Sequence, residues 1–198
     1  MFNDTSSPLA LLATRRSGKP RDLVAPGPDA DQLARILTIA ARTPDHGKLS
    51  PWRFVVIDDR AALSALLARA SRAERPAAPV GEVAALDQFA HQAPTLVVVL
   101  SSPQPESHIP VWEQELSAGA VCMNLLHAAH ASGFAGGWLT GWASSSPMVR
   151  DALGRAPERI AGFVFLGTPA RALDERPRPD MARIVAHWPL TLTGPRPS

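Results

Sequence analysis

The sequence predicts an α+β fold in which helices flank a mainly antiparallel central sheet. Short apolar runs suited to buried strands are few, and longer stretches with helical spacing of apolar residues lie between them. No internal repeat and no linker divides the 198 residues, so residues 1–198 are expected to form a single domain. Residues 1–8 and the tail beyond about residue 188 are expected to be poorly ordered.

The first third of the chain predicts two helices and one strand. The apolar stretch Leu9–Thr14 favours a short helix, and the proline- and glycine-rich sequence up to Pro28 favours an extended segment. Asp29 or Asp31 can cap the next helix, in which apolar residues recur at helical spacing. Trp52–Ile57 is then expected to form a buried strand.

The middle of the chain predicts two helices and the central strand. Asp58 and Asp59 can cap a helix that runs to about Arg72, and a second helix is expected over Glu82–His91. The run Thr95–Leu100 is apolar and β-branched, which is typical of a strand in the middle of a sheet.

The longest helical pattern covers Glu113–Ala131. Its apolar residues, among them Leu116 and Leu126, occur nearly all the way round the helix. Such a pattern indicates burial on most sides, as in a central helix or in one that meets a partner chain. Ser132 and Gly133 are expected to end this helix.

The last third of the chain predicts a short helix and a further strand. Gly136–Gly141 is expected to be strand or loop with a close backbone approach, and Ser146–Leu153 to contain a short helix that starts at Ser146-Pro147. Ile160–Leu166 favours a strand, which Gly167–Pro169 should stop. The proline-rich tail beyond Arg171 is expected to be mostly coil.

Composition and charge place the chain among cytoplasmic, globular proteins. Hydrophobic residues make up 45% and charged residues 19% of the sequence, and the single cysteine excludes an internal disulfide framework. No apolar run approaches the roughly 20 residues of a membrane span, and the N-terminus lacks the pattern of a signal peptide. Because acidic residues interleave the arginines and the net charge is only +2, neither nucleic acid nor membrane is expected as a partner.

Common cofactor and metal signatures are absent from the sequence. There is no Gly-x-Gly-x-x-Gly after a strand, no Walker loop and no Cys/His zinc spacing. His127 and His130 share a helix face but lack a third ligand, so no metal site is expected. Any nucleotide cofactor would therefore depend on arginines and loops to hold its phosphate.

Three stretches could carry such binding. Arg15-Arg16-Ser17, with Lys19 nearby, could grip a phosphate, although surface arginine pairs are often only solvated. Thr43–Trp52 is a polar, breaker-rich loop before a strand, which can equally be a helix C-cap with a turn. In Arg176-Pro177-Arg178 the proline stiffens the backbone and fixes the separation of the arginines, unless this is only a disordered basic tail.

Taken together and in their order, these stretches and two others resemble the nitroreductase family from about Leu9 to Trp188. The five matching stretches are Arg15–Ser17 with Lys19, Thr43–Phe54, Gln114–Ala129, Leu166–Pro169 and Arg176–Arg178. The resemblance implies a nitroreductase-like fold, an intertwined homodimer, and FMN bound at the subunit interface.

The resemblance also implies where the flavin is held. The residues that would contact its phosphate, ribityl chain and pyrimidine edge are Arg15, Arg16, Ser17 and Lys19. The residues that would clamp the phosphate are Arg176 and Arg178, with a further contact from Arg42. The residues that would reach the flavin from the other subunit are Pro44, Asp45 and His46. The residues that would line the dimethylbenzene side and the backbone near N5 are Trp138, Leu139 and Thr140.

The activity that the resemblance implies is two-electron hydride transfer. NAD(P)H would be the co-substrate, and flat, electron-poor acceptors such as nitroaromatics or quinones would follow in a ping-pong cycle. No side chain is expected to be catalytic, and Asp45-His46 is expected to serve in binding. Lys48 and Ser50 stand where the family commonly has Asn and Gln, which leaves the acceptor open.

Three alternatives stay open beside this interpretation. One is a reductive dehalogenase or a flavin-consuming relative on the same fold, since a fold does not determine a reaction. Another is an FMN-binding protein without turnover. The third is a basic nucleic-acid module, which the interleaved charges disfavour.

Overall fold

The computed structural model describes residues 2–79 and 81–188, and a five-stranded antiparallel sheet lies at its centre. The strands are β1 (Leu23–Val24), β2 (Trp52–Val56), β3 (Thr95–Ser101), β4 (Ala135–Leu139) and β5 (Arg159–Pro169). The long strand β5 pairs with β1, β3 and β4, and β2 pairs with β3. The predicted α+β class with a mainly antiparallel sheet is confirmed.

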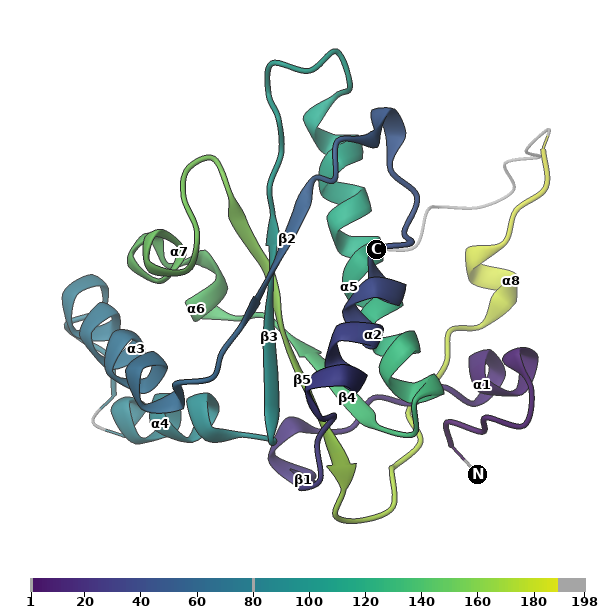
Figure 1. Ribbon diagram of the computed structural model, residues 1–198, viewed down its shortest axis with the longest axis horizontal. Helices are drawn as coiled ribbons and strands as arrows, with labels where there is room; N and C mark the ends of the chain where they lie inside the picture. Colours follow the sequence, from purple (N-terminus) through teal and green to yellow (C-terminus); the bar gives the residue numbers. More distant parts are fainter. Residues whose placement is uncertain (1, 80, 189–198) are drawn as a thin grey trace.

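Helices cover both faces of this sheet (Figure 1). One face carries α2 (Ala30–Ala40) and α5 (Val111–Ala131), and the other carries α3 (Arg60–Glu74), α4 (Glu82–His91), α6 (Trp142–Ser145) and α7 (Pro147–Leu153). In β3, Val97 and Val99 pack with α5, whereas Leu96, Val98 and Leu100 pack with α3 and α4. Burial of both faces explains why this strand is apolar without alternation.

Several helix starts follow the predicted caps. The Asp29 side chain accepts from the Gln32 amide, so Asp29 and not Asp31 caps α2. Asp59 caps α3 and Ser146 caps α7, each by accepting a backbone N–H three residues on. These local signals therefore determined where three helices begin.

The prediction that Gly167–Pro169 stop the last strand is wrong. β5 continues to Pro169 because Gly167 pairs with Ala135 of β4, and its last two residues pair with β1. A Cβ at Gly167 would come within 2.7 Å of the Pro94 ring. This glycine is thus required for close packing and does not end the strand.

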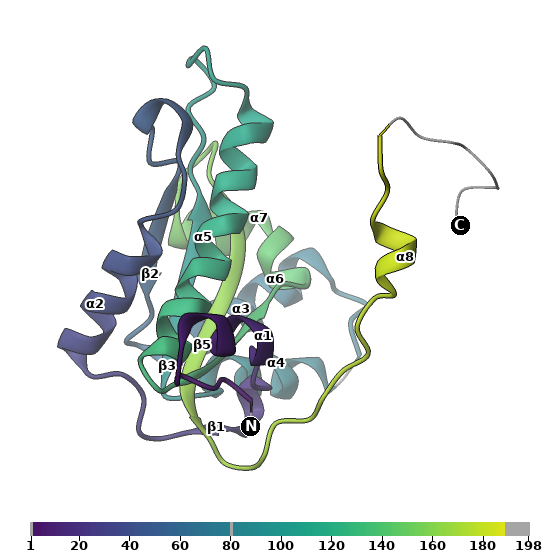
Figure 2. The same ribbon diagram turned by 90° about the vertical axis from the view of Figure 1, so that its right-hand side faces the viewer.

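The segments that follow α1 and β5 run close to each other. The helix α1 (Pro8–Thr14) leads into the segment that carries Arg15, and the segment after β5 passes it before reaching the short helix α8 (Met181–Ile184), which stands away from the body (Figure 2). Met1 and residues 189–198 lie outside the described residues, and the poor order expected for residues 1–8 and beyond about residue 188 stays a prediction. Among the described helices, none is both long and apolar enough to cross a membrane.

Candidate functional site

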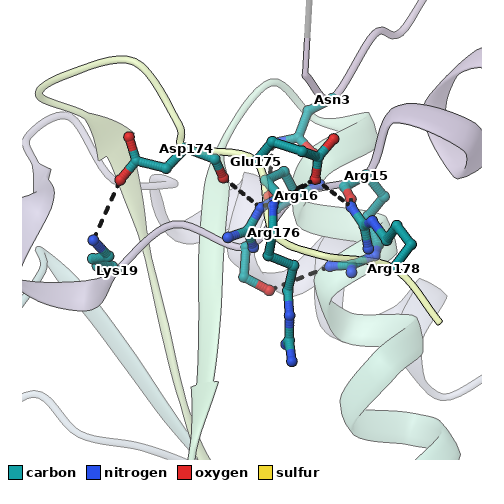
Figure 3. Close-up of polar contacts among 9 residues, drawn as sticks. Asn3, Arg15, Arg16, Lys19, Asp174, Glu175, Arg176 and Arg178 are labelled. Carbon is teal, nitrogen blue, oxygen red and sulfur yellow. Dashed lines mark hydrogen bonds and ion pairs between the residues drawn. The ribbon is translucent and has the colours of Figure 1, made fainter.

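A cluster of cationic side chains forms where the segment after α1 meets the segment after β5 (Figure 3). The Arg16 Nε donates to the carbonyl oxygen of Asp174 at 2.6 Å, and Lys19 Nζ lies 3.3 Å from the Asp174 carboxylate. Arg178 donates to the Glu175 carboxylate at 3.1 Å. The fold thus joins arginines that are about 160 residues apart in the sequence.

The cluster carries an excess of positive charge. Burial lowers the pKa of Arg15, and the neighbouring charges of Arg178, Arg16 and Arg176 lower it further. The carboxylate that faces the arginines directly is Glu175, whose pKa is lowered by a hydrogen bond from the Arg176 N–H and by the Arg178 and Arg16 charges. Such a set of guanidiniums is suited to a multiply charged anion.

Ser17 and Lys19 belong to an extended stretch that is tied to the edge of the sheet. Arg15 Nη1 donates to the Ser17 hydroxyl at 3.2 Å. The Gly18 N–H donates to the Gly136 carbonyl in β4 at 3.0 Å. The backbone of Ser17 and Gly18 therefore runs beside the glycine-rich strand, as the predicted close approach requires.

Trp138 and Leu139, the last two residues of β4, face opposite sides of the sheet. The Trp138 indole lies across β5 and donates to the Ala161 carbonyl at 3.0 Å, and a Cβ at Gly162 would collide with this ring. Leu139 packs instead into the core cluster beside α6 and α7, and Thr140 follows as an exposed residue. Trp138 thus shares a face of β4 with Gly136, on the α5 side, and Leu139 lies on the other face.

The loop after α2 is held against the other end of α5. The Ser117 hydroxyl donates to the Pro44 carbonyl at 2.6 Å, and His46 Nδ1 lies 2.9 Å from the Glu113 carboxylate. The two Asp45 carboxylate oxygens accept the amides of Leu49 and Ser50 at 3.1 and 2.7 Å. Hydrogen bonds from both the loop and the helix thus define this conformation.

Within one chain, the arginine cluster and this loop are well separated. Arg15 lies close enough to His127 and His130, near the C-terminal end of α5, to lower the pKa of both rings, although burial is the larger cause. His46 contacts Glu113 at the N-terminal end. Since a helix rises 1.5 Å per residue, 14 residues separate the two places by roughly 20 Å.

Arg42 lies between these two places. The helix α2 ends at Ala40, where the Asn124 amide donates to the carbonyls of Ile39 and Ala40 at 2.9 and 3.1 Å. Arg42 follows directly, at the start of the turn that leads to Pro44. Arg42 therefore lies between the loop and the arginine cluster, and its expected phosphate contact stays a prediction.

Sequence reasoning missed four residues that shape these places. Glu113 and Ser117, one turn apart on α5, hold the loop, and no local pattern connects them to residues so far away in the sequence. Asp174 and Glu175 pair with the cationic cluster, and their position directly before Arg176 was a visible signal. The described residues contain no group of three or more side chains that could hold a metal ion.

Comparison with known proteins gives a consistent result. A model of the nitroreductase family matches residues 12–168. A protein of Escherichia coli strain K12, provisionally named the NAD(P)H nitroreductase YdjA, is 39% identical over 168 residues, covering 81% of this chain and 87% of the relative.

Solved structures show the same fold. A nitroreductase-like family protein from Bacillus cereus superposes with a TM-score of 0.76 at 20% identity, covering 93% of this chain and 97% of the other. A provisionally named nitroreductase from Desulfovibrio desulfuricans, crystallised in complex with FMN, gives a TM-score of 0.69 at 22% identity, covering 93% and 99%.

Proposed function

Because the chain belongs to the nitroreductase family, we propose that it is an FMN-dependent NAD(P)H oxidoreductase whose flavin lies at the interface of a homodimer. The main support for this proposal is the cluster of arginines where the segment after α1 meets the segment after β5. The names of its relatives add NAD(P)H as reductant, and an FMN complex is known for a protein of the same fold.

The donor set fits the phosphate of FMN. A phosphate monoester carries close to two negative charges and three strong acceptor oxygens, and guanidiniums bind such a group through two parallel hydrogen bonds. Arg15, Arg16, Arg176 and Arg178 would supply these donors. Asp174 and Glu175 now hold Arg16, Lys19 and Arg178, and the phosphate would take over part of their role as counter-ions.

The remaining residues would orient the flavin ring. Ser17 would contact the ribityl chain, and Lys19 would place its charge beside the pyrimidine edge, where it stabilises negative charge that develops during reduction. Trp138 and Thr140 at the end of β4 would lie along the opposite edge of the ring. When bound, FMN supplies hydride transfer between the nicotinamide and an acceptor.

A second chain would complete the site. Pro44 and His46 contact the N-terminal half of α5, away from the arginine cluster of their own chain, so Pro44, Asp45 and His46 would reach the flavin of the partner. A two-fold axis repeats each such contact and would form two equal sites. Leu116 on α5 is 64% exposed in the single chain, which supports a partner at this helix.

The acceptors would be flat, electron-poor molecules. One open face of the flavin would bind NAD(P)H and then the acceptor, so the two substrates would bind in turn and give ping-pong kinetics. Nitroaromatics and quinones have the shape and the electron affinity for this position. Oxidation of NAD(P)H by the FMN-loaded protein with one of these acceptors separates this function from that of a carrier without turnover.

The cofactor itself provides the first test. We expect the purified protein to be yellow and to release FMN, not FAD, on denaturation, since four arginines suit one phosphate and no adenosine-binding glycine motif is present. Absorption spectra and chromatography of the released flavin measure this. A colourless protein that takes up no added FMN would refute the proposed function.

A further inference from the structure

We propose that His46 and Glu113 form a proton-donating pair for the acceptor. His46 would be the catalytic residue that touches the acceptor, and Glu113 a positioning residue that acts through His46. The inference rests on the proposed function, which brings His46 of one chain to the flavin of its partner.

The geometry of the pair defines the orientation of the imidazole ring. Glu113 Oε2 lies 2.9 Å from His46 Nδ1, and the Glu113 side chain is 32% exposed, whereas that of His46 is 65% exposed. A carboxylate at this distance accepts a hydrogen bond from Nδ1–H. This bond orients the ring and leaves Nε2 free to contact another group. In hydrolase triads a carboxylate orients a proton-transferring histidine in the same way.

The backbone around His46 is held firmly enough for such a role. Ser117, one turn after Glu113 on α5, fixes the carbonyl of Pro44 at 2.6 Å. The Asp45 carboxylate accepts two backbone amides of its own loop, so its oxygens are committed to the fold. Of the two titratable residues in Asp45-His46, His46 is therefore the one that can exchange a proton with a ligand.

The proposed step supplies the proton that two-electron reduction requires. In the reduction of 1,4-benzoquinone, one carbonyl oxygen receives the hydride that NAD(P)H provides through the cofactor, and an electron pair moves to the second oxygen. This oxygen takes the Nε2 proton of His46, so that the N–H bond breaks, an O–H bond forms, and hydroquinone results. Water then returns a proton to Nε2 of His46, and the Glu113 carboxylate, which accepts a hydrogen bond from Nδ1–H, keeps the ring oriented.

Two acceptors separate this role from a structural one. Ferricyanide takes single electrons and no proton, whereas 1,4-benzoquinone needs both. Pre-reduced protein is mixed with each acceptor, and the return of the oxidised flavin absorbance is followed for wild type, His46→Gln, Glu113→Gln and Glu115→Gln. Glu115→Gln is the matched control, because Glu115 lies two residues along α5 and pairs with Arg159 at 3.2 Å on the surface.

We expect the quinone reaction to be affected more than the ferricyanide reaction. His46→Gln should lower the ratio of the benzoquinone rate to the ferricyanide rate about 10- to 100-fold and Glu113→Gln about 10-fold, at the lower end of general acid catalysis. Glu115→Gln should match wild type with both acceptors. Equal slowing with both acceptors would indicate a structural role, and unchanged quinone rates in both variants would exclude proton donation; either result overturns the inference and leaves the proposed function intact.

A nuclear magnetic resonance signal provides a second measurement, without turnover. In the resting full-length protein, the Nδ1 proton of His46 should exchange slowly with water in wild type and in Glu115→Gln, and rapidly in Glu113→Ala. Rapid exchange in wild type would contradict the pairing with Glu113. If wild type binds no flavin or passes no electrons to ferricyanide, the proposed function fails and the inference fails with it.

Discussion

At the residue scale, Glu175 competes for Arg178 with any anion that enters the arginine cluster. Their side chains are 3.1 Å apart, so a bound phosphate would replace one carboxylate contact of Arg178. We expect Arg178→Ala to weaken FMN binding by about 1.5–3 kcal/mol, the size of a charged hydrogen bond. The opposite change, Glu175→Gln, should tighten FMN binding because it removes the competing charge.

Titration of the flavin-free protein with FMN, followed by flavin fluorescence, measures both effects. The fold should persist in both variants, since both side chains are exposed. If Arg178→Ala leaves the affinity unchanged while Arg16→Ala abolishes it, Arg176–Arg178 is only a solvated segment.

His130 should make the stability of the protein depend on pH. Its ring is 1% exposed, neither ring nitrogen has a hydrogen-bond partner among the described residues, and burial, followed by the charges of Arg15 and His127, lowers its pKa from 6.5 to about 4. Between these values the unfolded state binds the proton and the folded state does not. The free energy of unfolding should therefore fall by an amount on the order of 3 kcal/mol as the pH falls from 6.5 to 4.

Urea unfolding of wild type and His130→Leu at several pH values tests this effect. The variant should lose most of the slope between pH 6.5 and 4, because leucine has no proton to bind. The same slope in both proteins would assign the pH dependence to other groups.

At the residue scale, the members of the arginine cluster were easier to predict from the sequence than the contacts between distant side chains. Arg15, Arg16, Arg176 and Arg178 were selected from the sequence by type and spacing, and the fold brings them together. The partner of His46 could not be predicted, because 67 residues separate it from Glu113 and only the packing of the loop against α5 joins them.

At the scale of elements, the spacing of apolar residues predicted those helices and strands whose bounds depend on local sequence alone. The bounds of α4 agree with the prediction, and β3 extends it by one residue, since apolar spacing and β-branched residues act within the segment. The two-residue strand β1 was not predicted, because it exists only through its pairing with the end of β5. The same pairing extends β5 past Gly167.

The outer face of α5 leads to a prediction about assembly. Trp112 and Leu116, one turn apart, are 61% and 64% exposed, whereas Ala118, Cys122 and Leu125 of the same helix are buried on the sheet. We expect Leu116→Lys to shift the protein to monomers without lowering the stability of the folded chain, since this side chain is already exposed. Val83→Lys on α4, behind the opposite face of the sheet, is the control.

Size-exclusion chromatography with light scattering measures the mass of each variant. The control, whose Val83 is 41% exposed, should keep the mass of wild type. If Leu116→Lys remains a dimer at every concentration, the outer face of α5 lies outside the interface.

At the scale of the whole molecule, the proposed site would be complete only in a pair of chains. The arginine cluster and the loop with His46 lie near opposite ends of α5, and we propose that one ligand touches both by bridging two copies. A ligand that binds only the dimer stabilises the dimer by mass action. Flavin binding and dimerisation should therefore be a single coupled event.

Sedimentation over a dilution series, with and without FMN, tests this claim most directly. We expect FMN to move with the dimer, to lower the concentration at which the dimer dissociates, and to do both less effectively in His46→Ala. A monomer that carries one FMN at every concentration would contradict the shared site.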